Sequence, residues 1–290
     1  MRTTGGLTIE RMVELGGVSR SGFYRFDATA PRADPHMDLR DDIQKIALEW
    51  PCYGRPRITE ELRDRGWTVN PKLVHRLMRE DNLLCVRKRK FVVTTDSNHG
   101  RKIYPNLAHG VAPTAPDQLW RADITYIRLR DEFVFLAVIL DAYSRRVIGW
   151  ELDRTMEDSL TLAALRMALS HRAPQSKERP TGLAHHSDRG SQYASNEYTD
   201  LLKAHGIEIS MSRKGNPWDN AACESFMKTL KYEEVLRNDY RDLAEARASI
   251  AGFLDKLYNP KRLHSALGYM PPAKFEAEHK KEAAARQLSV

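Results

Sequence analysis

Three acidic residues lie in or next to segments that the sequence pattern predicts to be strands and a helix of an α/β core. Asp123 lies inside a strand-like segment, 119–128, whose alternation places it on the face opposite its apolar neighbours. A charge within a strand is costly unless it is paired or binds a metal. Asp188 follows the strand-like segment 182–187, at the carboxyl end of a strand, where ligands gather in open sheets. Glu224 lies on a helix.

The helix that carries Glu224 has a recognisable start. Asn216 is expected to be its N-cap and Pro217 its first helical residue. Glu224 then falls in the early turns, where the helix dipole tolerates negative charge.

Three carboxylates from two strands and a helix are suited to phosphodiester chemistry. In-line displacement at phosphorus is served by two divalent metals about 4 Å apart that carboxylates hold. Mg²⁺ prefers oxygen ligands and keeps positions open for substrate phosphate. The sequence therefore predicts a site for two Mg²⁺ or Mn²⁺ ions at Asp123, Asp188 and Glu224. The alternative is that each carboxylate is a surface charge or an ion-pair partner.

Basic residues on a second predicted helix could contact DNA. The helix begins with Asn70 as N-cap and Pro71 at its first position, after a turn at 66–69 that suggests a helix-turn-helix. Its outer face carries three cations at spacings of four and three residues, and a basic run follows it. The predicted DNA-binding residues in this region are Lys72, Arg76, Arg79, Arg87, Lys88, Arg89 and Lys90. A solvated helix face is the alternative interpretation.

Two lysines extend from Glu224 along its helix. Lys228 and Lys231 follow at i+4 and i+7, on the same face, and Asn220 precedes at i−4. We predict that both lysines bind the DNA backbone beside the metals. The alternative is an intrahelical pair of Glu224 with Lys228.

The remaining elements must position these residues. Strand-like segments at 119–128, 133–140 and 146–152, then alternating helices and strands, predict a mixed sheet with helices on its faces, as in the ribonuclease-H-like fold. We expect a helical DNA-binding region, a linker, this α/β catalytic core, and a tail with one final helix at 241–258 followed by a basic segment. The boundaries are 1–92, 93–118, 119–240 and 241–290.

Composition agrees with an enzyme that handles nucleic acid. The net charge of +7 divides into +6 over 1–110, −2 over 111–240 and +3 over 241–290. Three separated cysteines without ligand spacing indicate neither a zinc site nor a disulfide framework. The sequence contains no apolar run of about 20 residues, the length that a membrane span needs, and no recognisable signal peptide. We therefore expect a cytoplasmic protein. The sequence has no Gly-rich phosphate-binding loop, so we expect no nucleotide cofactor.

Eight motifs spread over most of the chain resemble one known family, the insertion-sequence transposases of the IS-three family, in particular their second-reading-frame (OrfB) product. The motifs are VSRSGFY (18–24), YGRPRI (53–58), DITYI (123–127), LDAYSRRVIGW (140–150), HHSDRGSQY (185–193), SMSRKGN (210–216), DNAACESF (219–226) and RLHSALGY (262–269).

The resemblance implies a DDE catalytic core of the retroviral-integrase superfamily. Its two aspartates fall on Asp123 and Asp188 and its glutamate on Glu224, with 35 residues between the last two, as the family pattern expects. It implies cleavage at transposon ends and transfer of the 3′-hydroxyl into DNA. The implied partners are DNA, further copies of the chain on that DNA, and a first-frame helix-turn-helix protein, near the prokaryotic nucleoid. Asp141 matches another family aspartate, which we interpret as structural.

Two other functions fit parts of the pattern. A DNA-binding regulator or inactive relic with the same fold would be expected to have lost a carboxylate of the triad, and this chain retains all three. A different ribonuclease-H-like nuclease, such as a resolvase or an RNA hydrolase, would not need the basic N-terminal helices. His185 and His186, close to Asp188, are interpreted as packing or polar support rather than as catalytic groups.

Overall fold

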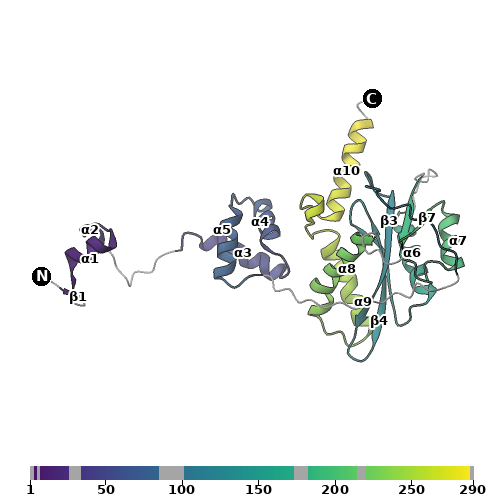
Figure 1. Ribbon diagram of the computed structural model, residues 1–290, viewed down its shortest axis with the longest axis horizontal. Helices are drawn as coiled ribbons and strands as arrows, with labels where there is room; N and C mark the ends of the chain where they lie inside the picture. Colours follow the sequence, from purple (N-terminus) through teal and green to yellow (C-terminus); the bar gives the residue numbers. More distant parts are fainter. Residues whose placement is uncertain are drawn as a thin grey trace.

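The computed structural model describes residues 3–4, 7–25, 34–84, 101–172, 182–213 and 220–287. Along the chain there follow a small N-terminal unit, a three-helix unit and an α/β core extended by C-terminal helices (Figure 1). In the described part of the chain, no helix is both long and apolar enough to span a bilayer.

The N-terminal unit is a two-stranded ladder followed by two short helices. Its elements are β1 Thr3–Thr4, β2 Leu7–Thr8, α1 Ile9–Gly16 and α2 Arg20–Arg25. Gly17, with φ 59°, ends α1 in the left-handed conformation that glycine adopts without strain. The Ser19 hydroxyl accepts a hydrogen bond from the Gly22 amide at 3.0 Å, and so caps the start of α2.

The three-helix unit has its own apolar core. Its helices are α3 Met37–Glu49, α4 Arg55–Asp64 and α5 Pro71–Glu80. The Asn70 side chain caps α5 by accepting from the Lys72 amide at 2.8 Å, as predicted. Val74 and Leu77 are buried, which leaves the predicted cationic face of α5 outward.

A five-stranded mixed sheet forms the core, in the order β5-β4-β3-β6-β7. Its strands are β3 Leu119–Arg128, β4 Phe133–Asp141, β5 Val147–Asp153, β6 Ala184–Ser187 and β7 Glu208–Met211. The first three pair antiparallel, whereas β6 runs parallel to both β3 and β7. The predicted mixed sheet is therefore confirmed, with β3 at its centre.

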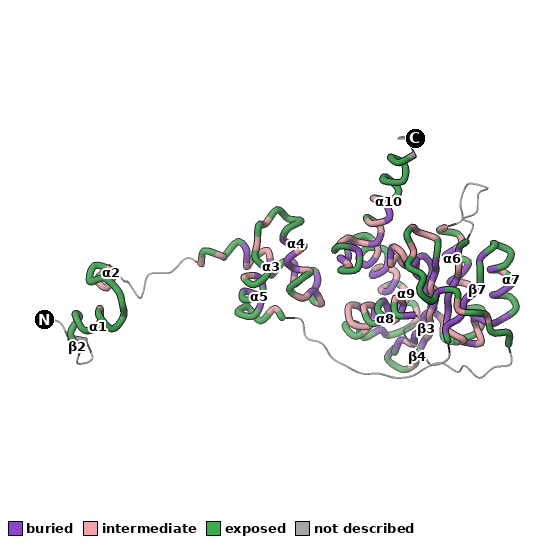
Figure 2. The backbone as a smooth tube through the Cα atoms, turned by 45° about the horizontal axis from the view of Figure 1, so that its top comes forward, coloured by how far each residue is buried: buried purple, intermediate pink, exposed green. Residues whose placement is uncertain are grey.

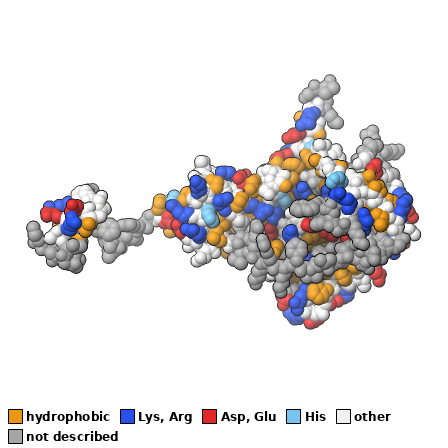
Figure 3. All heavy atoms as spheres, viewed as in Figure 1, with side chains coloured by type: hydrophobic (Ala, Val, Ile, Leu, Met, Phe, Trp, Pro, Cys, Tyr) orange, Lys and Arg blue, Asp and Glu red, His pale blue; other side chains and the backbone are white. Residues whose placement is uncertain are grey.

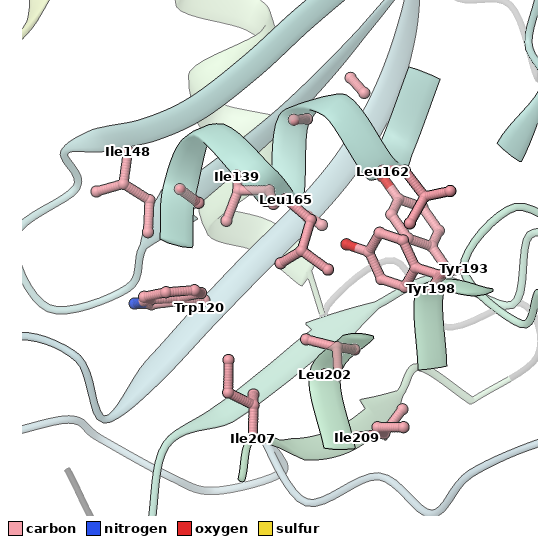
Figure 4. Close-up of a cluster of buried hydrophobic side chains, with 14 of the residues drawn as sticks. Trp120, Ile139, Ile148, Leu162, Leu165, Tyr193, Tyr198, Leu202, Ile207 and Ile209 are labelled. Atoms are coloured by element: carbon pink, nitrogen blue, oxygen red, sulfur yellow. The ribbon is translucent and has the colours of Figure 1, made fainter. Parts of the chain in front are cut away.

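Helices cover both faces of this sheet. Helices α6 Asp158–Arg172 and α7 Asn196–Ala204 pack on one face, over a cluster that includes Trp120 and Ile139 (Figure 4). The other face is covered by α8 Ala221–Glu233 and α9 Leu243–Gly252. Alternate residues of β4 enter the two clusters, so the strand is buried on both sides. Figure 2 colours the residues of the core by their burial.

The C-terminal region differs from the expectation. Helix α9 continues as a π-helix at Phe253–Tyr258, which matches the predicted segment 241–258. It is not the final helix, because α10 Pro272–Gln287 follows. Two short 3-10 helices occur in this region: Val235–Arg237 lies between α8 and α9, and Ser265–Leu267 lies between the π-helix and α10.

Residues 101–118 contain no helix or strand, yet they contact the core. The Met211 amide at the sheet edge donates to the Pro105 carbonyl at 3.2 Å, and the Leu107 amide donates to the Ser210 hydroxyl at 2.8 Å. Ala108 is buried against Leu119. This segment therefore lies along the edge formed by β7.

Candidate active site

Asp123 lies in the middle of the central strand. Trp120 and Ala122 enter the cluster beneath α6 and α7, whereas Ile127 enters the opposite cluster, beneath α8 and α9. The alternation of β3 therefore places Asp123, as predicted, on the α8 side of the sheet. The side chain is half-buried, and its Oδ1 accepts a hydrogen bond from the Ile124 amide at 2.9 Å.

Asp188 comes next to Asp123 through the parallel pairing of β3 with β6. Arg121 stands opposite His186 in this register, so two further residues along each chain lead to Asp123 and Asp188. The Asp188 Oδ1 accepts from the Gly190 amide at 2.9 Å. The carboxylate therefore lies at the carboxyl end of its strand, where the sequence pattern placed it.

Glu224 is brought to the sheet by α8, which packs on β3. Cys223 and Phe226 are buried in the cluster between them, and Glu224 is half-buried. Asn220, just before the helix, donates from Nδ2 to the Ala122 carbonyl at 3.0 Å. That bond ties the start of α8 to the residue before Asp123. The predicted helix start at 216–217 lies outside the described residues.

The pKa of Asp123 indicates that the three carboxylates lie close enough to affect one another. Burial, with the charges of Asp188 and then Glu224, raises the pKa of Asp123 to about 7, although the Ile124 amide and Lys231 act in the opposite direction. In the part of the chain that the structure describes, no three His, Cys, Asp or Glu side chains are close enough to hold a metal ion as they stand. The acids converge without forming a closed ligand set.

Both histidines before Asp188 are structural, as predicted. His185 is buried, its Nε2 lies 2.9 Å from the Tyr198 hydroxyl, and burial lowers its pKa to about 3. His186 is fully buried between the hydroxyls of Ser210 and Ser212, at 2.8 and 3.0 Å from its two ring nitrogens. Neither imidazole is placed to act on a substrate.

Asp141 is also structural, as the sequence pattern suggested. It is fully buried at the end of β4 and accepts hydrogen bonds from the backbone amides of Asp117, Tyr143 and Ser144, at 2.7, 3.0 and 2.9 Å. These bonds close the turn that leads to β5.

The two lysines of α8 have different surroundings. Lys228 is exposed. Lys231 is half-buried, with its Nζ 4.4 Å from the centroid of the Tyr126 ring. Burial lowers the pKa of Lys231, and Asp123 partly offsets this effect. Lys231 therefore belongs to the immediate electrostatic environment of the triad.

The cations of α5 lie on a different unit from the carboxylates. Lys72, Arg76 and Arg79 are all exposed, and Arg76 pairs with Glu80 at 3.7 Å. Figure 3 shows Lys and Arg side chains among other types on the visible face of the three-helix unit. The predicted basic run Arg87, Lys88, Arg89 and Lys90 lies outside the described residues.

Two residues that support the site were not predicted from the sequence. Asn220 was expected only as part of a helix face, and in the structure it anchors α8 to β3. Gly190 had no predicted role, and its ideal Cβ would lie 3.0 Å from the Asp188 carboxylate. The spacing of four residues between Asn220 and Glu224 was the available signal.

Comparison with known protein families supports this architecture. A family model described as "Integrase core domain" matches residues 113–217, and a second with the same description matches 205–272. An "HTH-like domain" model matches residues 36–91, which contain α3, α4 and α5. The catalytic core and the helix-turn-helix region are thereby confirmed as family domains.

Relatives cover nearly the whole chain. A protein of Shigella sonnei, named "Insertion element IS600 uncharacterized 31 kDa protein", is 38% identical over 278 residues, 94% of this chain and 100% of its own length. The transposase InsF of insertion sequence IS3A from Escherichia coli K12 is 34% identical over 275 residues, 93% of this chain and 94% of its own.

Among solved structures, the HTLV-2 integrase catalytic core domain in complex with magnesium is similar with a TM-score of 0.41 and 16% identity. It covers 56% of this chain and 98% of that one. The identities to the insertion-sequence proteins and the two domain matches establish the family. The chain belongs to the IS3-type insertion-sequence transposases, which are DNA transposases of the DDE polynucleotidyl transferase class with an integrase core.

Proposed function

We propose that Asp123, Asp188 and Glu224 are the triad with which this transposase cleaves DNA at transposon ends and joins the 3′-hydroxyl to target DNA. The observation that supports this proposal is the convergence of the three acids from β3, β6 and α8. Asp188 and Glu224 both act on the pKa of Asp123.

The donor chemistry of the triad fits Mg²⁺ or Mn²⁺, in one or two ions. All three side chains offer carboxylate oxygens, which hard divalent cations prefer. Their mutual repulsion makes the charged form of Asp123 costly, and bound cations would relieve this cost. When bound, the ions would activate the attacking hydroxyl and stabilise the leaving oxygen, without a nucleotide cofactor.

The chain itself orients the three carboxylates. The Ile124 amide fixes one oxygen of Asp123, and the Gly190 amide fixes one oxygen of Asp188. Asn220 holds the start of α8 against β3, one helical turn before Glu224. Such preorganisation lowers the barrier, because the ligands need less movement during the reaction.

Lys228 and Lys231 are proposed to bind the DNA backbone beside the triad. Both follow Glu224 along α8, and Lys231 lies near enough to Asp123 for each to affect the other's pKa. A phosphate at the carboxylates would therefore lie close to an ammonium group. Replacing both lysines by alanine should raise the DNA concentration for half-maximal cleavage; an unchanged concentration together with lost stability would make them structural.

The three-helix unit is proposed to bind transposon-end DNA through Lys72, Arg76 and Arg79, together with the run 87–90. Its family match is an HTH-like domain, and Lys72, Arg76 and Arg79 are all exposed on α5. Assembly of several copies on DNA, a first-frame partner protein and a cytoplasmic, nucleoid-associated location are proposed from the family resemblance. Light scattering of the complex with end DNA would test the assembly.

Substitution of the triad tests the proposal. Asp123→Asn, Asp188→Asn and Glu224→Gln keep the side-chain shape and remove the charge. Each should lower cleavage and joining of labelled end DNA by about 100-fold or more while DNA affinity stays within about twofold. Glu132→Gln, at a partly exposed acid paired with Arg154, is the matched control and should cleave normally.

Three outcomes would contradict the proposal. Near-normal cleavage by any of the three variants would remove that residue from the triad. Cleavage by the unaltered protein that persists after chelation of divalent metal would exclude the metal-dependent reaction. No cleavage by the unaltered protein in Mg²⁺ or Mn²⁺ would instead favour the DNA-binding regulator.

A further inference from the structure

Two of the sequence motifs, YGRPRI at 53–58 and RLHSALGY at 262–269, meet in the structure although about 200 residues separate them. Leu263 is buried in the core of the three-helix unit. Its backbone amide donates to the Tyr53 hydroxyl at 2.8 Å, and its carbonyl accepts from the Arg57 Nε at 2.9 Å. Side chains of the helix-turn-helix unit thus satisfy both backbone polar groups of a residue from the C-terminal region.

Arg262, the residue before Leu263, binds to α8 instead of to the three-helix unit. The Arg262 guanidinium donates from Nε and Nη2 to the two carboxylate oxygens of Glu233, each at 2.6 Å. The pair is largely removed from solvent, with exposed fractions of 3% for Arg262 and 11% for Glu233. Nearby, the Cys52 Sγ donates to the Tyr232 carbonyl at 3.4 Å. Residues 262 and 263 therefore form a clasp between the three-helix unit and α8.

Charge makes the clasp dependent on Glu233. Arg57 and Arg262 lie close enough that each disfavours the other's charge, and burial together with this repulsion lowers the pKa of Arg57. Burial, followed by Arg262, Arg57 and Arg145, lowers the pKa of His264 to about 3. Without Glu233, neighbouring guanidinium groups would repel one another in a poorly solvated place.

Helix α8 carries Glu224 near its start and Glu233 at its last residue. The nine residue-to-residue steps from Glu224 to Glu233 span about 13 Å of helix axis. A movement of the three-helix unit at the clasp therefore reaches the catalytic glutamate through one rigid element, whose other end is tied to β3 by Asn220.

We propose that Arg262 is a positioning residue for transposition, which locks the DNA-binding unit to α8 so that DNA held on α5 enters the catalytic carboxylates in a fixed register. This inference rests on the proposed function, in which Glu224 belongs to the triad and α5 binds end DNA. Arg262 acts through Glu233 and does not touch the reacting atoms.

The test compares Arg262→Met with the double variant Arg262→Met/Glu233→Leu in the full chain. The single variant leaves Glu233 buried without its partner, whereas the double variant replaces the whole pair by apolar side chains, an exchange that buried ion pairs often tolerate. Arg262→Met should lower the kcat for end cleavage by about tenfold or more, with the Kd for end DNA within about twofold. The double variant should recover kcat to within about threefold of the unaltered protein.

A matched buried ion pair outside the clasp provides the control. Arg172 pairs with Glu276 between α6 and α10, with exposed fractions of 9% and 3%. Arg172→Met should lower the melting temperature and leave kcat unchanged, which separates loss of stability from loss of positioning. If Arg262→Met does not fold by circular dichroism, Arg262→Lys, which keeps the charge and loses the two-pronged contact, takes its place with the same expected loss of kcat.

Three outcomes would overturn the inference: normal kcat in the folded single variant, a folded double variant that stays as slow as the single one, or an equal loss of kcat in Arg172→Met. Asp188→Asn, assayed in parallel, keeps the two proposals apart. If it is inactive while Arg262→Met cleaves normally, only the clasp fails. If it cleaves normally, the proposed triad fails.

Discussion

Small groups around the acids determine where the carboxylates point. One oxygen of Asp188 accepts a hydrogen bond from the amide of Gly190. The carboxylate also lies close to the space that a side chain at position 190 would occupy. An ideal Cβ on Gly190 would stand 3.0 Å from Asp188 Oδ1 and 3.1 Å from Gln192 Oε1. Both contacts are closer than carbon and oxygen normally approach, so the carboxylate would have to move by a few tenths of an ångström.

We therefore expect Gly190→Ala to slow cleavage of end DNA by about tenfold, because displacement of a catalytic group by about 1 Å already costs about 100-fold. The measurement is the initial cleavage rate at saturating DNA and metal. Gly252→Ala in α9 is the control, because no heavy atom lies within 4 Å of its ideal Cβ. Equal rates for Gly190→Ala and the unaltered protein would show that Asp188 tolerates the added methyl group.

The acids of the site were predictable one by one, and their support was not. A charge in a strand and a charge after a strand are visible in sequence as departures from the apolar pattern. The hydrogen bond of Asn220 to Ala122 joins residues 98 apart, and the pair of Arg262 with Glu233 joins residues 29 apart. No periodicity links such residues, because tertiary packing alone brings them together.

At the scale of elements, α10 shows how a polar helix is held on the core. Glu276 is buried near its start, where it accepts from the Ser144 hydroxyl at 2.6 Å and from Arg146 at 2.8 Å. It also pairs with Arg172 of α6. Further along, the Tyr143 hydroxyl lies 3.0 Å from His279 Nδ1. The docking of α10 thus depends on one buried carboxylate with several donors.

We expect Glu276→Gln to lower the free energy of unfolding by about 3–5 kcal/mol near neutral pH, because Arg172 keeps its burial and loses its counter-charge. Although burial raises the pKa of Glu276, Arg172, Ser144 and Arg146 hold it below its ordinary value. A carboxyl with a depressed folded-state pKa stabilises above its unfolded pKa, and this contribution is lost as pH falls through the folded value. The difference between variant and unaltered protein should therefore shrink in acid.

Urea unfolding at a series of pH values from neutral to acid measures this difference. Glu282→Gln, on the same helix, is the control, since Glu282 and its partner Arg286 are both largely exposed. Its effect should stay within about 0.5 kcal/mol. An effect of Glu276→Gln that does not change with pH would contradict the assignment of the stabilisation to its charge.

The same helix marks the limit of the sequence analysis. Strands β3, β4 and β5 were placed within about one residue because alternating and apolar runs end at turns. Helix α10 was missed because its residues are mostly Ala, Glu and Lys, without an apolar face that indicates burial. A helix that packs on the core through a buried acidic side chain has no periodic pattern of apolar residues from which it could be predicted.

At the scale of the whole molecule, the proposed function requires DNA to engage two separate surfaces. The cations of α5 lie on the three-helix unit, and the carboxylates lie on the α/β core, joined through the clasp at 262–263. The α5 cations also differ among themselves, because Arg76 pairs with Glu80, which in turn pairs with Arg40. Lys72 and Arg79 are therefore the better residues for a test of DNA binding.

Replacing Lys72 and Arg79 together by alanine should weaken binding of end DNA and flatten its dependence on salt. Each phosphate contact releases about 0.9 counterion from B-form DNA, so the slope of log affinity against log salt should fall by about 1.8. The matched control is Lys45→Ala/Arg63→Ala, whose cations on α3 and α4 pair with Asp41 at 2.6 Å and Glu60 at 2.8 Å. Fluorescence anisotropy over a range of salt concentrations measures both slopes. An unchanged slope, or an equal change in the control, would make the α5 cations a solvated helix face.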